Sequence, residues 1–436
     1  MNFLIILISN LIFFNTSLGN SSETVSTFSP SCILIDSSSG KILYEKNAFE
    51  IKYPASTTKI MTAILAIENC QLTDIATVSH NAIFSVPISY SHASLKENEQ
   101  LTIEQLLNVL LIPSANDAAN VIAEHISGSV ENFSILMNKK AKEIGCRNTN
   151  FVNANGIHNE SHTTTAYDLA LMGQYAMKNP TFRKIVKKTS YTLPATNIYP
   201  HNNRIFKTTN ELLRENYSEK KDNYYYPNAI GIKTGYTSEA GSCIVAAASK
   251  DNFEVILVIL DDKLTEDGLS QRFIDCKTLF DYAFKNYKYI NLNKKDQIIK
   301  TIEVPGATKE TQSLNILTKN SIDALVDINF DKNSVVSNIE LKNLKAPISE
   351  GSVVGEISYT IDDNIFSSEL IAQNNVISSG FLENLLKVSL LFVVIYILYR
   401  LLNQNNKNSP KGTNKKNYKN KKKTTKGKIK FTLLNI

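Results

Sequence analysis

The spacing of hydrophobic residues changes along the chain, and these changes predict where helices give way to strands. From about Ser56 to residue 177 the apolar residues recur at helical spacing. Residues 189–226 are polar, have little periodicity and are expected to form loops. The first helix is expected to begin near Ser56. Four further helices are expected over Leu101–Ile112, Ala118–Ile126, Val130–Ile144 and Thr165–Met177.

Strand-like patterns flank this helical region on both sides. A hairpin is expected over residues 31–47, and a meander over Ala229–Thr234, Ser242–Ser249 and Phe253–Leu260, with a helix over Leu269–Phe284 after it. Taken together, these elements predict an α+β domain over residues 29–288, in which helices flank an antiparallel sheet.

From about Asn291 the pattern changes to short alternating strands separated by turns. This pattern predicts a separate, small all-β domain over residues 291–375. The expected strands are Ile298–Val304, Ser313–Leu317, Ile322–Ile328, Val353–Tyr359 and Glu369–Ala372.

The first residues have the features of a secretory signal peptide. An apolar run is followed by Ser17-Leu18-Gly19, a small-x-small cleavage pattern, which predicts a signal over residues 1–19. The positive charge usual at the start of a signal is missing, because the first basic residue is Lys41. A buried N-terminal helix is the alternative interpretation.

A second apolar stretch, over residues 381–402, predicts a transmembrane helix. At about 1.5 Å per residue it would span roughly 33 Å, and residues 388–399 are uncharged. A helix lying in the membrane interface is the alternative. The lysine-rich tail over residues 403–436 then marks the cytoplasmic side. We therefore expect a single-pass protein of the cell membrane with its catalytic domain outside the cytoplasm.

The tail also explains the formal net charge of +6, because it is rich in lysine and contains no acid. The remainder of the chain is mildly acidic, so no nucleic-acid partner is expected. The cysteines are odd in number, lack any Cys-x-x-Cys spacing and are expected to be buried free thiols. The histidines show no paired spacing, so neither a metal nor another cofactor is expected.

The first motif with chemical content is Ser56-x-x-Lys59. Ser56 opens an apolar helix, and Lys59 lies three residues on, so its amine can reach the serine hydroxyl. This pairing suits a serine nucleophile with a lysine base. The same spacing occurs at Ser38 and at Ser218 without an apolar helix, and the motif alone is more typical of a serine N-cap beside a solvated lysine.

Two further motifs, Ser114-Ala115-Asn116 on a loop between helices and Lys233-Thr234-Gly235 at the end of a strand, change this interpretation. Together the three motifs resemble those of the exported D-alanyl-D-alanine carboxypeptidases, the low-molecular-mass penicillin-binding proteins. The sequences around the three motifs also resemble this family; they are Pro54–Ala63, Leu111–Asn120 and Gly231–Thr237. The resemblance covers about residues 29–373. It implies a β-lactamase/transpeptidase-like catalytic domain, followed by a small β domain.

The resemblance also implies roles for the catalytic residues. Lys59 takes the Ser56 proton, Ser114 relays a proton to the leaving D-alanine, and Asn116 orients Lys59 and the substrate amide. A free lysine, with a pKa of about 10.4, is too often protonated to act as a base. Burial and the nearby charge of Lys233 are expected to lower the pKa of Lys59.

Other residues are expected to bind the substrate. The resemblance implies that Lys233 and Thr234 hold the terminal carboxylate and that Gly235 lets the strand pass closely. It also implies that the backbone N–H groups of Ser56 and Tyr236 form an oxyanion hole. Arg272 matches a family arginine near the carboxylate, with a surface position as the alternative. For His162 and Asp168 we expect capping and loop packing. Ala115 and Tyr236 depart from the family's commoner glycine and histidine.

The implied activity is removal of the terminal D-alanine from peptidoglycan stem peptides through a Ser56 acyl-enzyme. Such a protein would serve cell-wall biogenesis and cell shape, and β-lactam antibiotics would inhibit it. One alternative is a β-lactamase, although no Glu-x-x-Leu-Asn motif follows Ser114. The other is a catalytically idle scaffold that binds the cell wall.

Overall fold

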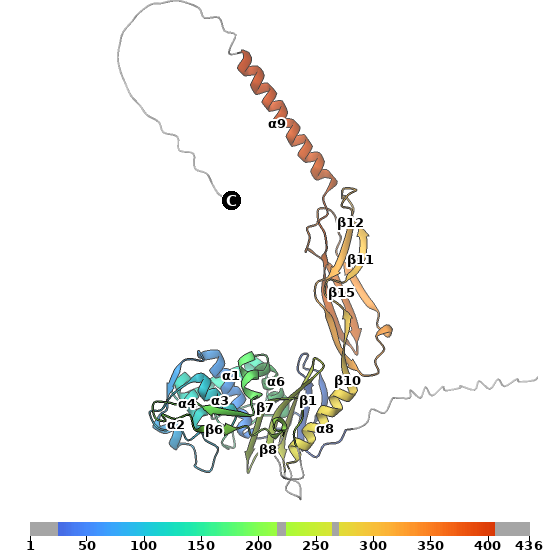
Figure 1. The fold of residues 1–436 in the computed structure, drawn as a ribbon. Helices are drawn as coiled ribbons and strands as arrows, with labels where there is room; N and C mark the ends of the chain where they lie inside the picture. The colour runs from blue at the N-terminus through green and yellow to red at the C-terminus, as the bar shows by residue number, and fades with distance from the viewer. Residues whose placement is uncertain (1–24, 216–223, 264–269, 406–436) are drawn as a thin grey trace, which may run out of the picture. The chain divides into compact units, whose positions relative to one another are not determined.

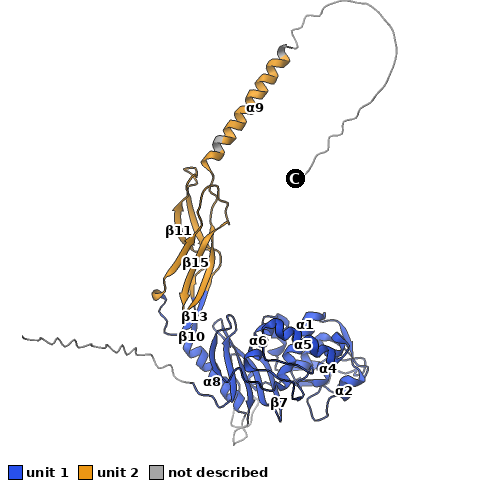
Figure 2. Cartoon of the chain, turned by 180° about the vertical axis from the view of Figure 1, so that it is seen from behind, with its two compact units in different colours: residues 1–290, 323–332 blue, residues 291–322, 333–436 orange. Residues whose placement is uncertain are grey.

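The computed structural model describes residues 25–215, 224–263 and 270–405, which form two compact units (Figures 1 and 2). The first unit contains residues up to Ile290 together with Asp323–Lys332, and the second contains Asn291–Ile322 and the residues from Asn333 onwards. The predicted signal over residues 1–19, and most of the predicted tail over residues 403–436, lie outside the described residues.

The first unit is built on a five-stranded antiparallel sheet, as the meander and hairpin patterns predicted. The order is β2-β1-β9-β8-β7, which leaves one edge of β7 unpaired within the sheet. This free edge faces the candidate site described below. The strands are β1 (Ser31–Asp36), β2 (Ile42–Lys46), β7 (Ala229–Thr237), β8 (Gly241–Lys250) and β9 (Phe253–Asp262).

Both faces of this sheet are buried, because alternate side chains of its central strands enter two separate cores. In β9, Ile256 and Val258 join the core on the side of α1 and α6, whereas Leu257 and Ile259 join the core under α8. The near-continuous apolar runs of the sequence therefore reflect a sheet that is covered on both sides.

The helices on one face form an all-helical layer around α1, which is buried from Lys59 to Ala66. Several ends carry the expected caps: Thr102 forms a capping box with Gln105, and Gly128 ends α4 with a φ of 76°. The layer comprises α1 (Lys59–Asn69), α2 (His80–Phe84), α3 (Ile103–Leu111), α4 (Asn116–Ser127), α5 (Val130–Ile144), α6 (Ala166–Met177) and α7 (Pro180–Val186), with the short strands β3 (Ile75–Thr77) and β4 (Gln100–Thr102). The other face is covered by α8 (Gln271–Asn286).

The polar region predicted as loops is partly ordered, and that prediction was wrong for two segments. β5 (Ser190–Leu193) and β6 (Arg204–Lys207) form an antiparallel hairpin, followed by the 3₁₀ turn η2 (Glu211–Leu213). Tyrosine and threonine in β5, and isoleucine and phenylalanine in β6, suit strands. Each strand has only four residues, however, which is too short for an alternation of apolar positions to reveal it.

The second unit contains a five-stranded antiparallel sheet of order β11-β12-β16-β15-β14. The strand β14 (Ser337–Leu341) was missed, because only Ile339 and Leu341 in it are apolar. A second correction concerns β13 (Ile322–Asp327): it was expected in the small β domain, but it pairs with β10 (Tyr287–Asn293), and Asp323–Lys332 belong to the first unit (Figure 2). The remaining strands are β11 (Ile298–Glu303), β12 (Ser313–Thr318), β15 (Val353–Ile361) and β16 (Asn364–Ala372).

The last described element is the helix α9 (Ser379–Asn405). The most apolar stretch of 18 residues in it has a mean hydropathy of 2.2, and the described side chains are exposed. Among the described residues it is the one helix that is long and apolar enough to cross a membrane.

Candidate active site

Ser56 and Lys59 lie at the junction of a 3₁₀ turn and α1. The turn η1 (Ala55–Thr58) precedes Lys59, so the single helix predicted from about Ser56 is in fact two elements. Thr57 and Thr58 stabilise the turn by donating side-chain hydrogen bonds to the carbonyls of Pro54 and Ala55. The turn brings Lys59 Nζ to 2.9 Å from Ser56 Oγ.

The Lys59 amine is fully buried, and its hydrogen-bond partners are neutral. Besides Ser56 Oγ they are Asn116 Oδ1 at 2.7 Å and the Asn155 carbonyl oxygen at 2.6 Å. A neutral amine has two N–H donors and one lone pair. The two carbonyl-type oxygens accept both hydrogens, which leaves the lone pair for the Ser56 hydroxyl. This arrangement fits a neutral lysine that accepts the serine proton. An ammonium that donates its third N–H to Ser56 Oγ would fit the same partners, so the pKa of Lys59 decides between the two forms.

Electrostatics favour the same protonation state. Burial lowers the pKa of Lys59 well below its ordinary value, and the charge of Lys233 lowers it further. Burial, together with the charge of Arg272, also lowers the pKa of Lys233, to about 7. The predicted direction of the Lys59 shift is therefore confirmed, with burial as the larger cause and the second cation as the smaller one.

Asn116 and Ser114 lie at the start of α4. Asn116 is the first residue of the helix, so its predicted place on a loop was wrong. Its side-chain amide donates to the Ser91 carbonyl at 2.8 Å, which turns its oxygen toward Lys59. Ser114 remains on the connection with a φ of 71°, a left-handed backbone that is costly for serine. Its buried hydroxyl has no hydrogen-bond partner among the described residues.

A cleft of about 460 Å³ opens beside Ser56 and Ser114. The end of β7 forms one wall of it through Thr234, Gly235 and Tyr236. A Cβ atom at position 235 would lie 2.8 Å from the Ser56 nitrogen, so this close approach requires glycine. The complete lining is Ser56, Ser89, Tyr90, Ser91, Ser114, Thr209, Thr234, Gly235, Tyr236, Thr237, Ser238 and Arg272.

The two cations near this wall differ in their position. Arg272 lines the cleft and donates to the carbonyls of Gly235 at 2.9 Å and Cys243 at 3.2 Å, so the surface alternative for Arg272 was wrong. Lys233 is only 1% exposed and donates to the Thr234 carbonyl at 2.8 Å. Lys233 therefore lies behind the cleft lining, where its charge still influences Lys59.

Several residues that support the site were missing from the sequence-based set. Gly156 packs under the serine turn, where a Cβ would lie only 1.9 Å from the Ala55 carbonyl oxygen. Thr209 contacts Thr234, with 2.5 Å between the two hydroxyl oxygens. A lone glycine, threonine or backbone carbonyl in a loop carries no motif, so sequence offered no signal for these contacts.

His162 and Asp168 have the packing roles that were expected. His162 Nδ1 accepts the Val152 N–H at 3.0 Å, which leaves Nε2 to donate to Thr58 Oγ1 at 2.8 Å. Burial lowers the pKa of His162 to about 3, so its ring stays neutral. Asp168 accepts N–H groups from Arg147 and Asn148.

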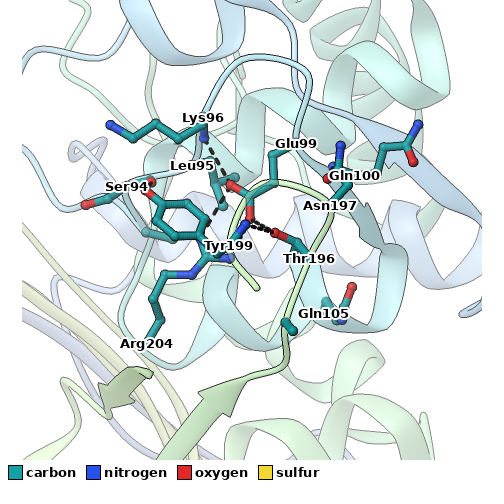
Figure 3. A network of polar contacts seen from close by, with 12 residues as sticks. Ser94, Leu95, Lys96, Glu99, Gln100, Gln105, Thr196, Asn197, Tyr199 and Arg204 are labelled. Carbon is teal, nitrogen blue, oxygen red and sulfur yellow. Dashed lines mark hydrogen bonds and ion pairs between the residues drawn. The ribbon is translucent and has the colours of Figure 1, made fainter. Parts of the chain in front are cut away.

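A buried ion pair holds the loops around the cleft (Figure 3). The carboxylate of Glu99 is fully buried and is paired with Arg204 at the start of β6. It also accepts the Thr196 hydroxyl at 2.8 Å and the Lys96 N–H at 3.0 Å, and the Arg204 guanidinium lies 4.1 Å from the centre of the Tyr199 ring. These contacts join the β5–β6 hairpin to the loop that ends at Glu99.

Asp117 anchors the same loop nearer to the catalytic residues. Its carboxylate accepts the backbone N–H groups of Ala93 at 2.9 Å and Leu95 at 3.1 Å. The Asn116 N–H donates to the Ser91 carbonyl at 2.9 Å. The loop that forms one side of the cleft is therefore fixed by α4 at one end and by the Glu99–Arg204 pair at the other.

Comparison with known proteins gives consistent matches. The profile of the D-alanyl-D-alanine carboxypeptidase family (Peptidase S11) matches residues 19–264, and that of the penicillin-binding protein 5 C-terminal domain matches residues 287–378. The D-alanyl-D-alanine carboxypeptidase DacF of Bacillus subtilis is 32% identical over 81% of this chain and 87% of its own length. The enzyme DacC of Escherichia coli is 30% identical over 80% of this chain and 84% of its own.

Solved structures agree with these matches. Penicillin-binding protein 5 from Haemophilus influenzae is 27% identical and has a TM-score of 0.62, covering 81% of this chain and 99% of that structure. The Streptomyces K15 DD-transpeptidase is 31% identical with a TM-score of 0.53, covering 60% of this chain and 98% of that structure. The similarity therefore extends over both units in the first case and over the catalytic part in the second.

Proposed function

Because the chain belongs to the D-alanyl-D-alanine carboxypeptidase family, we propose that Ser56 is the nucleophile with which it removes the terminal D-alanine from peptidoglycan stem peptides. The observation that carries this assignment is the hydrogen bonding of the Lys59 amine, in which two carbonyl-type oxygens accept both N–H groups of the neutral form. The lone pair is then available to the Ser56 hydroxyl.

In the first step Ser56 Oγ attacks the carbonyl carbon of the penultimate D-alanine as Lys59 takes its proton. The N–H groups of Ser56 and Tyr236 stabilise the developing oxyanion. The amine of the last D-alanine leaves with a proton relayed through Ser114, which forms an ester on Ser56. Water then hydrolyses this ester, with Lys59 again taking a proton, and the shortened peptide is released.

The substrate carboxylate is proposed to bind at the end of β7. Thr234 and Arg272 both line the cleft, and the Thr209 hydroxyl lies within hydrogen-bond distance of that of Thr234. Lys233 contributes mainly through its charge, because it is buried behind this wall. An anion at this place also lowers the cost of holding Lys233 and Arg272 as cations.

The test is mass spectrometry of a muramyl pentapeptide incubated with the full-length protein in detergent. Loss of a single alanine with the unaltered protein, and no loss with Ser56→Ala, is the expected result. Undiminished release by a folded Ser56→Ala variant would contradict the assignment of the nucleophile.

A penicillin adduct provides a second measurement that separates this activity from that of a β-lactamase. The adduct on Ser56 is expected to persist for minutes to hours, as a slow deacylation requires, whereas a β-lactamase would clear it quickly. An intact protein that forms no adduct at all would favour an idle scaffold.

We also propose that α9 anchors the protein in the cell membrane, with a cleaved signal over residues 1–19 directing the catalytic unit outside the cytoplasm. There the enzyme would trim stem peptides during cell-wall remodelling and so influence cell shape. The exposed apolar side chains along α9 support the anchor. In cell fractionation the full chain is expected in the membrane fraction and a chain ending at Gly380 in the soluble fraction. Equal membrane retention of both chains would exclude α9 as the anchor.

A further inference from the structure

The strongest unassigned group of side chains lies at the opposite end of α1 and α4 from the catalytic residues. Cys70 directly follows the last residue of α1, Asp74 lies four residues later, and His125 is in the last turn of α4. One potential ligand atom from each residue lies within 4.8 Å of the other two. The sulfur and the carboxylate are partly buried, and the imidazole is exposed.

From this arrangement we propose that Cys70, Asp74 and His125 form a binding site for a divalent metal ion of the zinc class. Thiolate, imidazole and carboxylate are the three ligand types that proteins offer to Zn²⁺, and three protein ligands leave a fourth tetrahedral position for water. Small adjustments of the side chains bring three atoms at this separation around one ion. Cys70 binds as a thiolate, and its proton passes to the solvent.

Backbone hydrogen bonds hold two of the three ligands, Cys70 and Asp74, before any ion binds. The Cys70 N–H donates to the Ala66 carbonyl at 3.2 Å, which fixes the residue at the end of α1. One oxygen of Asp74 accepts the Gln71 N–H at 2.7 Å, which orients its carboxylate. The Asp74 carbonyl accepts the Ile103 N–H at 2.9 Å, which joins this turn to α3. Cys70 and Asp74 are therefore held by the turn after α1, and His125 is carried by the last turn of α4.

The local field also favours a cation. Two helices, α1 and α4, end beside the site, and the C-terminal end of a helix carries partial negative charge. The Asp74 carboxylate supplies one formal negative charge before an ion binds, and Cys70 adds a second only when it binds as a thiolate. Independent features of the backbone and of the side chains thus point to the same class of ligand.

The position of the site gives it a structural consequence. Lys59 is the first residue of α1 and Asn116 is the first residue of α4, and their side chains meet in the catalytic cleft. An ion bound at the other end of the same two helices would link them a second time. No sequence motif marks this site, because Asp74 and His125 are far apart in the chain and have no paired-ligand spacing.

The test uses the full-length protein in detergent, stripped of metal and titrated with ZnCl₂ by calorimetry. We expect one ion per chain, and a loss of affinity on the order of 100-fold or more in Cys70→Ser, Asp74→Asn and His125→Gln. His80→Gln is the matched control, because His80 and Glu97 form another exposed histidine–carboxylate pair without a thiol. That variant is expected to bind Zn²⁺ as tightly as the unaltered chain.

Co²⁺, added in excess, provides a second measurement that identifies the thiolate ligand directly. Binding to the unaltered chain is expected to produce a thiolate-to-cobalt charge-transfer band that is absent in Cys70→Ser. Far-UV circular dichroism and formation of the penicillin adduct verify that each variant is folded. Absence of the band, or equal Zn²⁺ affinity in the folded Cys70→Ser variant, would overturn the proposal, whether or not the peptidase activity is as proposed.

Discussion

Charged side chains are buried in two places near the cleft, and the two places handle their charge in opposite ways. Glu99 and Arg204 form a pair in which each charge has its counter-ion. Glu99 also accepts two further hydrogen bonds, and the Arg204 guanidinium lies over the Tyr199 ring. Lys59 and Lys233 are equally buried, but the partners of their amines are neutral oxygens. The first arrangement keeps its residues charged and holds the loops in place, whereas the second favours loss of the proton.

The difference teaches that burial alone does not tell a structural charge from a reactive one. A fully buried ion pair contributes mainly through the cost of breaking it, because removing one partner leaves the other unpaired. A buried amine without a counter-ion is already in an unfavourable charged state, so it becomes a base near neutral pH. The comparison therefore predicts that activity and stability respond differently at the two places.

The largest expected effect is on activity, at Lys59. Lys59→Met removes the base but keeps an unbranched side chain, so kcat/KM for the pentapeptide is expected to fall about 10³-fold to 10⁴-fold. The free energy of unfolding is expected to change by no more than about 1 kcal/mol, because loss of a costly buried amine offsets two carbonyls left without a donor. Kinetics and urea unfolding on the same preparation check both parts. A large loss of stability would contradict the comparison.

The reverse outcome is expected at the ion pair. Glu99→Gln leaves Arg204 buried without a counter-ion and is expected to lower the free energy of unfolding by about 3–5 kcal/mol. The catalytic groups are untouched, so folded protein at low temperature should lose far less activity than Lys59→Met does. Urea unfolding and single-turnover acylation by penicillin measure the two effects. The exposed pair Lys319–Glu369 is the control, and Glu369→Gln is expected to leave the urea unfolding curve almost unchanged.

Lys233 tests whether the two amines are coupled. Lys233→Met removes a positive charge behind the carboxylate site, and kcat/KM is expected to fall on the order of 100-fold. The same change removes one of the causes that lower the pKa of Lys59, so that pKa rises. The acid limb of the pH profile for kcat/KM should therefore move to higher pH. An unchanged limb would mean that burial alone sets the pKa of Lys59.

The pH dependence of stability follows from the same lysine. The pKa of Lys233 falls from 10.5 to about 7 in the folded protein, so between these values the unfolded chain binds more protons. Stability is therefore expected to rise as the pH increases from about 7 toward 10.5. Urea unfolding at several pH values should show a smaller rise in Lys233→Met. An equal rise in that variant would assign the effect to other groups.

The smallest effect is expected at Tyr236, where the family more often has histidine. The side chain is 65% exposed, and the proposed role belongs to its backbone N–H. Tyr236→His is therefore expected to change stability by less than about 0.5 kcal/mol. The rate of penicillin acylation is expected to change by less than about threefold, because a change of about 0.5 kcal/mol in the activation free energy alters a rate by about that factor. A much larger change would give the side chain a role in substrate binding.

The sequence predicted the parts of the molecule that depend on local spacing. Ser56 and Lys59 are three residues apart, so one turn brings them together, and the apolar runs of β8 and β9 identify strands without knowledge of their partners. The site motifs were recognisable because their residues are chemically distinctive. The same reasoning located Arg272, although it left open whether that side chain was buried.

The rest depends on contacts between distant segments, which no local pattern encodes. The Asn155 carbonyl approaches Lys59 from a loop far along the chain, and any residue type supplies a carbonyl. Glu99 and Arg204 lie in polar segments that resemble ordinary loops until they are seen to meet. The pairing of β13 with β10 likewise follows from the path of the chain, because its own pattern suits either unit.

The close packing of Gly156 under the serine turn has a consequence for mutational tolerance. A single methyl group at this position would lie 1.9 Å from the Ala55 carbonyl oxygen, on a backbone whose φ of 86° already disfavours any side chain. At Tyr236, by contrast, an entire aromatic ring lies at the mouth of the cleft and is largely exposed. In a saturation library, larger changes in side-chain size usually cause larger losses of activity, and this relation should invert around the cleft. Gly156→Ala is expected to eliminate more activity than replacement of the whole Tyr236 ring.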